Sequence, residues 1–348
     1  MRALRLLGDG RSFYHCISRV VDRRKVFAPQ DKEVFRKIMR NLERFMGVRV
    51  VTYCVMSNHF HLLVEVPDRE TLAPLREDEL LELLPLLHDA GTVETVEQEL
   101  ERARETGDGK WQAEIHDRYE RRRGSLSYFL KELKQRVTLY MNKRLDRTGT
   151  FWEGRFKSIL VEGRELSLLT VAAYIDLNPV RAGLVEKPED YRWCGYAEAL
   201  SGTRGAKLAR RGLGIILSET LSDNELRADW RRTRNRYRQF LYEEGEAREE
   251  GVVSREEART GFSPEAVEAV LETQGEMPMA AVLRHKVRYF CDGAALGRAE
   301  FVEAIFSRER ERGKMGGIRI AGARKMRGAD WGELRVLRNL RKGVIGDG

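Results

Sequence analysis

Hydrophobic and polar positions in the first part of the chain alternate between the period of a strand and that of a helix. Residues 12–21 and 48–55 are rich in apolar, β-branched and aromatic residues, so each predicts a strand. The segment between them carries apolar residues at helical spacing: Val34, Ile38, Leu42 and Phe45. It predicts a helix over residues 32–46, capped by Asp31 and ended by Gly47.

The apolar run after the second predicted strand organises the rest of the chain. Its sequence is Met56-Ser-Asn-His-Phe-His-Leu-Leu-Val-Glu-Val66, and its Ser-Asn turn signal predicts a hairpin with residues 48–55. Alternate side chains of a strand point to opposite faces, so His59 and His61 project together while Phe60 points into the core. Strand, helix, strand and strand make half of a ferredoxin-like sandwich, which predicts an α+β fold with an antiparallel sheet and packed helices.

Three further segments extend this pattern. Residues 68–123 are rich in Glu and Leu and predict a helical insertion with a solvated acidic face. Ser125 opens a helix with one apolar stripe, formed by Leu126, Leu130, Leu133, Val137, Tyr140 and Met141. The loop Gly149-Thr-Phe-Trp-Glu-Gly-Arg-Phe-Lys157 then leads into a short strand over residues 158–161.

A last helix of this domain is predicted over residues 165–178. Pro179 disfavours helical geometry for the residue before it, so Asn178 is expected on the last turn. Tyr174 precedes Asn178 by one turn on the same helix face, and the two side chains can therefore face one point.

These elements divide the chain into an N-terminal domain and a C-terminal region. Residues 1–200 contain the strands and helices described so far. Residues 201–217 mix glycine with positive charge and predict a linker. Residues 218–348 predict a helical and basic region, a candidate for additional DNA binding, and no internal repeat is visible.

Composition narrows the function classes. The chain has 348 residues, a formal net charge of +8 and a calculated pI near 9.3, which favours a polyanionic partner. Its four scattered cysteines form no CxxC pair and predict neither a disulfide framework nor a zinc ribbon: Cys16, Cys54, Cys194 and Cys291. No signal peptide or membrane span is expected, so the predicted location is the cytoplasm.

The candidate chemistry lies on the histidine strand and the tyrosine helix. Two imidazoles on one strand face form half of a metal site, and the less favoured alternative is a pair of partly exposed histidines on an edge strand. Tyr174 has the alternative of a core tyrosine, and Asn178 that of a helix cap before Pro179. His15, in the apolar first strand, is interpreted as structural.

Taken together, these motifs resemble the HUH single-tyrosine transposases, and within them the REP-associated tyrosine transposase branch of the IS200-like type. The residues that carry the resemblance are Tyr14-His-Cys-Ile-Ser-Arg19, Met56-Ser-Asn-His-Phe-His-Leu-Leu-Val-Glu65, the loop of residues 149–157, and Ala173-Tyr-Ile-Asp-Leu-Asn-Pro-Val-Arg-Ala-Gly-Leu184. They occur in the family's order over roughly residues 12–200. The insertion and the C-terminal region lie outside the family core.

The resemblance implies cleavage and rejoining of single-stranded DNA beside hairpins, through a 5′-phosphotyrosine intermediate. It implies that Tyr174 is the nucleophile and that His59, His61 and Asn178 bind Mg²⁺ or Mn²⁺. The expected partner is single-stranded DNA with hairpin structure. The sequence leaves open whether a homodimer exchanges tyrosine helices or one chain completes its own site.

Basic and aromatic residues beside these motifs are candidates for DNA contacts. Four of them are expected to grip phosphates: Arg19, Arg155, Lys157 and Arg181. Trp152 would stack on an unpaired base or, alternatively, anchor its loop in the core. Two other functions stay open: a domesticated hairpin-binding regulator of DNA or RNA without turnover, and a Rep- or relaxase-type nicking enzyme. The latter is disfavoured because the sequence lacks a GxxxxGK[ST] motif.

Overall fold

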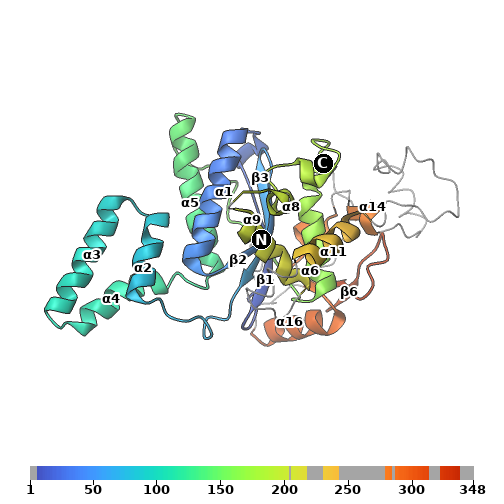
Figure 1. The fold of residues 1–348 in the computed structure, drawn as a ribbon. Helices are drawn as coiled ribbons and strands as arrows, with labels where there is room; N and C mark the ends of the chain where they lie inside the picture. Colours follow the sequence, from blue (N-terminus) through green and yellow to red (C-terminus); the bar gives the residue numbers. More distant parts are fainter. Residues whose placement is uncertain are drawn as a thin grey trace, which may run out of the picture.

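A seven-stranded sheet forms the centre of the molecule (Figure 1). The computed structural model describes residues 6–203, 205–217, 230–242, 279–283, 287–312 and 322–337. The strand order is β2-β3-β1-β4-β5-β7-β6. The strands are β1 (Ser12–Arg19), β2 (Arg49–Val55), β3 (His59–Val66), β4 (Lys157–Val161), β5 (Ala295–Gly297), β6 (Arg324–Lys325) and β7 (Arg335–Val336).

The first four strands have the order and direction of a ferredoxin-like sheet. β1 lies between β3 and β4 and pairs antiparallel with both, and β2 pairs antiparallel with β3. Helices α1 (Pro29–Met46) and α5 (Leu126–Arg144) pack against each other on one face of this sheet. The predicted α+β class with an antiparallel sheet and packed helices is confirmed.

The opposite face is covered by α6 (Glu165–Asp176) and by later helices. Strand alternation divides the core accordingly, because Phe60 and Leu62 join the cluster around α1 and α5 whereas Leu63 joins the cluster around α6. The two histidines of β3 alternate with Phe60 and Leu62. They therefore lie on the α6 side of the sheet.

Helix α1 begins earlier than predicted. Pro29 occupies its first position and Ala28 is the N-cap residue, while Asp31 lies inside the first turn and accepts a hydrogen bond from the Ala28 amide at 2.8 Å. The prediction of Asp31 as the N-cap is wrong, although its carboxylate still stabilises the helix start. Gly47 ends the helix in the left-handed conformation, with φ of 64°, as predicted.

The Glu- and Leu-rich stretch contains three helices that extend from one side of the body (Figure 1). They are α2 (Glu77–Leu83), α3 (Ala90–Glu105) and α4 (Gly109–Glu120). Shorter helical segments elsewhere are the 3-10 turns Val21–Arg23, Leu84–Leu86 and Pro188–Asp190, with α7 (Asn178–Arg181) and α8 (Gly195–Leu200). None of the described helices is both long and apolar enough to cross a membrane.

The linker prediction is wrong for most of its length, because α9 (Ala206–Leu217) is a buried helix that packs against the edge strand β2. Gly212 permits this close approach, since a Cβ atom there would lie 2.3 Å from the Val50 carbonyl oxygen. Gly212, one of the glycines that suggested a flexible connection, thus serves helix-to-strand packing.

The C-terminal region contains short strands besides the expected helices. It contains α11 (Trp230–Tyr242), α14 (Met279–Leu283), α15 (Tyr289–Asp292) and α16 (Ala299–Glu311). Strand β5 pairs parallel with β4, and the Leu160 and Glu162 amides donate to the Ala294 and Leu296 carbonyls at 3.0 and 2.8 Å. The region therefore extends the central sheet. Helices predicted within residues 243–278 lie outside the described residues.

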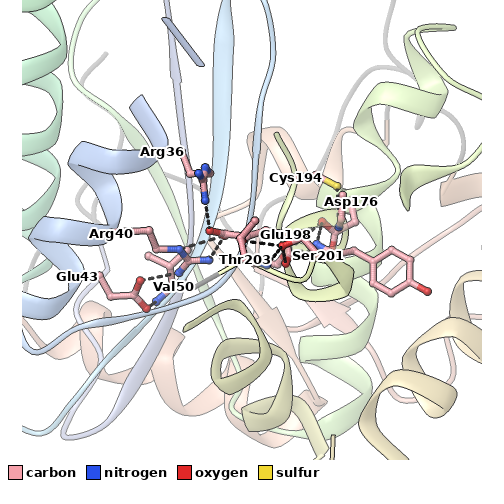
Figure 2. A network of polar contacts seen from close by, with 12 residues as sticks. Arg36, Arg40, Glu43, Val50, Asp176, Cys194, Glu198, Ser201 and Thr203 are labelled. Carbon is pink, nitrogen blue, oxygen red and sulfur yellow. Dashed lines mark hydrogen bonds and ion pairs between the residues drawn. The ribbon is translucent and has the colours of Figure 1, made fainter. Parts of the chain in front are cut away.

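A buried ionic network joins α1 to α8 beside β2 (Figure 2). Arg40 donates to Glu198 at 2.5 Å and to Glu43 at 2.6 Å, and Arg36 donates to Glu198 at 2.7 Å. Glu43 in turn accepts the Val50 amide of β2 at 2.8 Å. Each carboxylate is thus compensated by guanidinium and amide donors, which offsets the cost of burying charge.

Candidate active site

His59 and His61 lie side by side on β3, with ring centroids 5.2 Å apart and the rings edge to face. The antiparallel register places Arg19 of β1 opposite His59 and Ile17 opposite His61. His61 is only 4% exposed, whereas His59 is partly exposed. The predicted pair of neighbouring imidazoles is therefore present. It lies at the N-terminal end of β3, next to the hairpin turn between β2 and β3.

Each of these rings uses its Nδ1 atom in a hydrogen bond to a neighbouring side chain. Nδ1 of His59 lies 2.6 Å from Oδ1 of Asn58, and Nδ1 of His61 lies 2.9 Å from Nε2 of His15. Metal-binding histidines commonly use the second ring nitrogen in this way. Nε2 is therefore the atom of each ring that would bind a metal.

His15 is a member of this site that the sequence interpretation missed. It lies on β1 next to β3 and shares the face of Ile17 and Arg19, which are paired with the two histidines. The signal was available in the sequence, since odd-numbered residues of β1 share one face. Only the pairing of β1 with β3 reveals which face that is.

Burial keeps the inner histidines neutral. Loss of solvent lowers the pKa of His61 well below its ordinary value, and the neighbouring His15, His59 and Arg181 lower it further. Burial and the charge of Arg181 lower the pKa of His15 to about 3, against a small opposing effect of the Phe290 backbone. Neutral imidazoles are the form that binds metals and accepts hydrogen bonds.

Tyr174 reaches these histidines from α6. Its ring is 1% exposed, and its centroid lies 6.0 Å from those of both His15 and His61. On its other side it stacks on Phe290 of α15 at 4.6 Å. One chain thus places the phenol beside the histidine pair.

The Tyr174 hydroxyl is directed to Cys291, with the oxygen 3.0 Å from Sγ. Burial raises the pKa of Tyr174 well above its ordinary value, and the Cys291 thiol adds to this, while the Arg181 charge acts in the opposite direction. The phenol is therefore protonated at physiological pH. Attack by its oxygen on a phosphate requires a change that favours the phenolate.

Arg181 packs against the ring of Tyr174. Its guanidinium carbon lies 3.9 Å from the Tyr174 ring centroid, and it donates to the Tyr174 and Leu283 carbonyl oxygens, each at 2.7 Å. These contacts join the end of α6 to the C-terminal region. In this structure the guanidinium contacts protein groups that position Tyr174.

Asn178 lies beyond the end of α6. The helix stops at Asp176, and Asn178 begins the short helix α7, so the expectation that it occupies the last turn is wrong. Pro179 is accommodated as the second residue of α7, where its missing amide costs nothing. Asn178 is 8% exposed, and its Nδ2 has no hydrogen-bond partner in the described part of the chain. A buried amide nitrogen without a partner is costly.

The donor set suits a metal that takes part of its coordination from substrate. Among the described residues, no three His, Cys, Asp or Glu side chains are arranged to hold a metal ion. The neighbouring protein donors are the imidazole nitrogens of His59 and His61, and Asn178 is the third donor that the resemblance implies. Such a mixed set suits Mn²⁺ or Mg²⁺ with open positions for phosphate oxygens.

The other predicted contact residues divide into an exposed and a buried group. Arg155 and Lys157 are exposed, and Lys157 pairs with Asp292 at 3.2 Å, while Arg19 is half-buried opposite His59. Trp152 is buried, and its indole nitrogen donates to the Lys134 carbonyl at 3.1 Å. Its ring packs against three phenylalanines, the position expected of the loop anchor: Phe27, Phe60 and Phe151.

The first four strands thus carry paired histidines, and the buried Tyr174 lies beside them. Residues 11–75, which include β1, α1, β2 and β3, match the family model described as Transposase IS200 like. The resemblance expected from the motifs is confirmed over this segment, which contains His15, His59 and His61.

A solved structure is also similar to the chain. It is described as a REP-associated tyrosine transposase bound to a REP hairpin, with 13% sequence identity and a TM-score of 0.37. The similarity covers 57% of this chain and 86% of that chain. No curated protein matches the chain.

Proposed function

We propose that this protein is a metal-dependent endonuclease and strand transferase that cleaves and rejoins single-stranded DNA beside hairpins, such as REP-like palindromes. The observation that carries the proposal is the convergence of Tyr174 with His61, from a helix and a strand far apart in the sequence. The IS200-like family match and the solved relative bound to a REP hairpin support the same substrate class.

Tyr174 is the proposed nucleophile. Its phenolate oxygen forms a bond to the scissile phosphorus, the P–O3′ bond breaks, and the leaving 3′-oxygen takes up a proton. The product is a 5′-phosphotyrosine ester and a free 3′-hydroxyl. Because the new ester replaces a phosphodiester of similar energy, a 3′-hydroxyl can reverse the step without a nucleotide cofactor.

His59, His61 and Asn178 are the proposed holders of Mg²⁺ or Mn²⁺. When bound, the metal would polarise the scissile phosphate and offset its developing charge. The protein's own part is to orient both imidazoles through their Nδ1 hydrogen bonds and to keep His61 neutral by burial. It also excludes water from the phenol, which is buried between Phe290 and the histidines.

Access of DNA to Tyr174 requires movement of α15. Phe290 and Cys291 cover the ring and the hydroxyl, so a phosphate reaches the oxygen only after these contacts open. The DNA strand would be held by three basic residues. Arg19 lies on β1, Arg155 lies in the loop before β4, and Lys157 lies on β4. Because Tyr174 meets His61 within one chain, the proposed enzyme completes its site without exchanging helices in a homodimer.

The test is formation of a covalent adduct. Purified protein is incubated with Mn²⁺ or Mg²⁺ and a labelled hairpin-bearing single strand, and a band that survives denaturing electrophoresis is expected. Tyr174→Phe abolishes the band and retains DNA binding. Tyr128→Phe is the matched control, because this tyrosine is exposed on α5, and it keeps the band.

One competing function has an observation in its favour. The buried and protonated state of Tyr174 also suits a hairpin-binding regulator that has retained the site without turnover. Equal binding by wild type and Tyr174→Phe, with no adduct across a range of hairpins and both metals, would support that function over cleavage.

A further inference from the structure

His15 and His61 form a buried imidazole pair, and the direction of its hydrogen bond decides which nitrogen of His61 is free. Nε2 of His15 lies 2.9 Å from Nδ1 of His61, and the rings stack with centroids 5.1 Å apart and planes 26° from parallel. His15 is fully buried on β1. Two neighbouring strands therefore fix both rings, and neither can turn without breaking the stack.

We propose that His15 is a positioning residue, which holds His61 in the tautomer and orientation that present Nε2 to the metal. The inference rests on the proposed function, and it names the residue that supports His61, one of the proposed metal ligands. His61 can offer a lone pair at Nε2 only if its hydrogen is on Nδ1. That hydrogen needs an acceptor, and Nε2 of His15 is the atom placed to receive it.

The same argument fixes the state of His15. Because Nε2 of His15 accepts the hydrogen bond, the ring hydrogen of His15 is on Nδ1. Among the described residues, no atom meets the hydrogen-bond criteria with this Nδ1. The Phe290 backbone nevertheless lies close enough to raise the pKa of this ring. The ring of Phe290 stacks on Tyr174. Phe290 of α15 thus contacts both His15, which supports the proposed metal ligand His61, and Tyr174, the proposed nucleophile.

Two conservative substitutions separate positioning from simple packing. A glutamine at position 15 places its amide near the site of the histidine Nε2, whereas an asparagine places its amide near the site of Nδ1. His15→Gln should therefore retain the bond to His61, and His15→Asn should lose it while keeping a polar side chain.

The measurement is Mn²⁺ affinity by electron paramagnetic resonance titration, in the Tyr174→Phe background so that no chemistry intervenes. His15→Asn is expected to weaken Mn²⁺ binding about 10- to 100-fold, the usual effect of losing such a supporting group. His15→Gln should stay within a few-fold of the parent protein. Equal affinity of the parent and His15→Asn, or equal loss in both variants with unchanged thermal unfolding, would overturn the proposal.

A second measurement needs no substitution. Nitrogen-15 spectra of the wild-type histidine side chains should show His61 with its hydrogen on Nδ1 in the metal-free protein. A hydrogen on Nε2 of His61 would contradict the inference. The His59→Ala variant separates the two proposals. If His59→Ala binds Mn²⁺ like wild type, the proposed metal site is wrong. If His59→Ala loses Mn²⁺ binding while His15→Asn binds normally, only the role of His15 is rejected.

Discussion

The Tyr174 hydroxyl and the Cys291 thiol lie 3.0 Å apart, although 117 residues separate them in the chain. The contact brings the C-terminal region onto the group proposed to attack DNA. Phe290 beside it stacks on the same ring, so two consecutive residues of α15 cover the phenol. Helix α15 therefore controls the accessibility of Tyr174. This helix lies outside residues 11–75, the part of the chain that matches the IS200-like family.

Modification of Cys291 should block adduct formation. It is partly exposed, whereas Cys16, Cys54 and Cys194 are buried, so N-ethylmaleimide should react with it first. A maleimide group on this sulfur would occupy the space beside the Tyr174 hydroxyl. Mass spectrometry should find one label, and adduct yield should fall in wild type but not in Cys291→Ala. Full adduct yield after complete labelling would contradict this prediction.

Removing Glu198 should destabilise the fold strongly. The carboxylate is buried and accepts from Arg36 and Arg40, so Glu198→Ala leaves two guanidinium groups without their shared partner (Figure 2). The expected loss in the free energy of unfolding is about 3–5 kcal/mol, measured by urea denaturation. Asp78→Ala is the control, since it breaks an exposed pair with Arg76 that should contribute under about 1 kcal/mol.

Gly212→Ala should also destabilise the protein, for a steric reason. The added Cβ would lie 2.3 Å from the Val50 carbonyl oxygen and 2.7 Å from that of Val51, so α9 must move away from β2. We expect a loss of about 1–3 kcal/mol in thermal or urea unfolding. Gly202→Ala provides the comparison, because nothing lies within 4 Å of the corresponding position, and a similar loss there would argue against the packing explanation.

Lys134 should give the stability a specific pH dependence. Burial lowers its pKa to about 8, below its ordinary value of 10.5, while its ammonium donates to the Gly154 carbonyl at 2.5 Å. Between these two pKa values the unfolded chain binds the proton more readily than the folded protein. Through this group the free energy of unfolding therefore increases as the pH rises from about 8.

The comparison is with Lys134→Met, which removes the titrating group and keeps the aliphatic packing beside Trp152. Unfolding free energies of both proteins are measured from pH 7.5 to 10. The difference between wild type and variant should shift in favour of wild type as the pH rises, and a constant difference would refute the assignment.

Local patterns in the sequence were sufficient for the N-terminal fold. The strands, α1 and α5 follow from periodicity and turn signals that act within a few residues, as does the end of α1 at Gly47. The same alternation correctly predicted that His59 and His61 share a face. These features depend on neighbours in sequence, which the chain displays directly.

The failures involve contacts between distant segments. Helix α9 looked like a linker because Gly212 serves an approach to β2 that the sequence does not show. Strand β5 has three residues, and only its pairing with β4 makes it a strand. The role of His15 likewise depends on the register between β1 and β3. Each required the tertiary structure.

The pairing of β5 with β4 also limits how the protein can be divided. A fragment ending near residue 200 would keep the family motifs but leave β4 with an uncovered row of amides and carbonyls along its outer side. Exposed edge strands of this kind pair with strands of other molecules. The pairing of β5 therefore protects the outer edge of β4 from pairing with a second molecule.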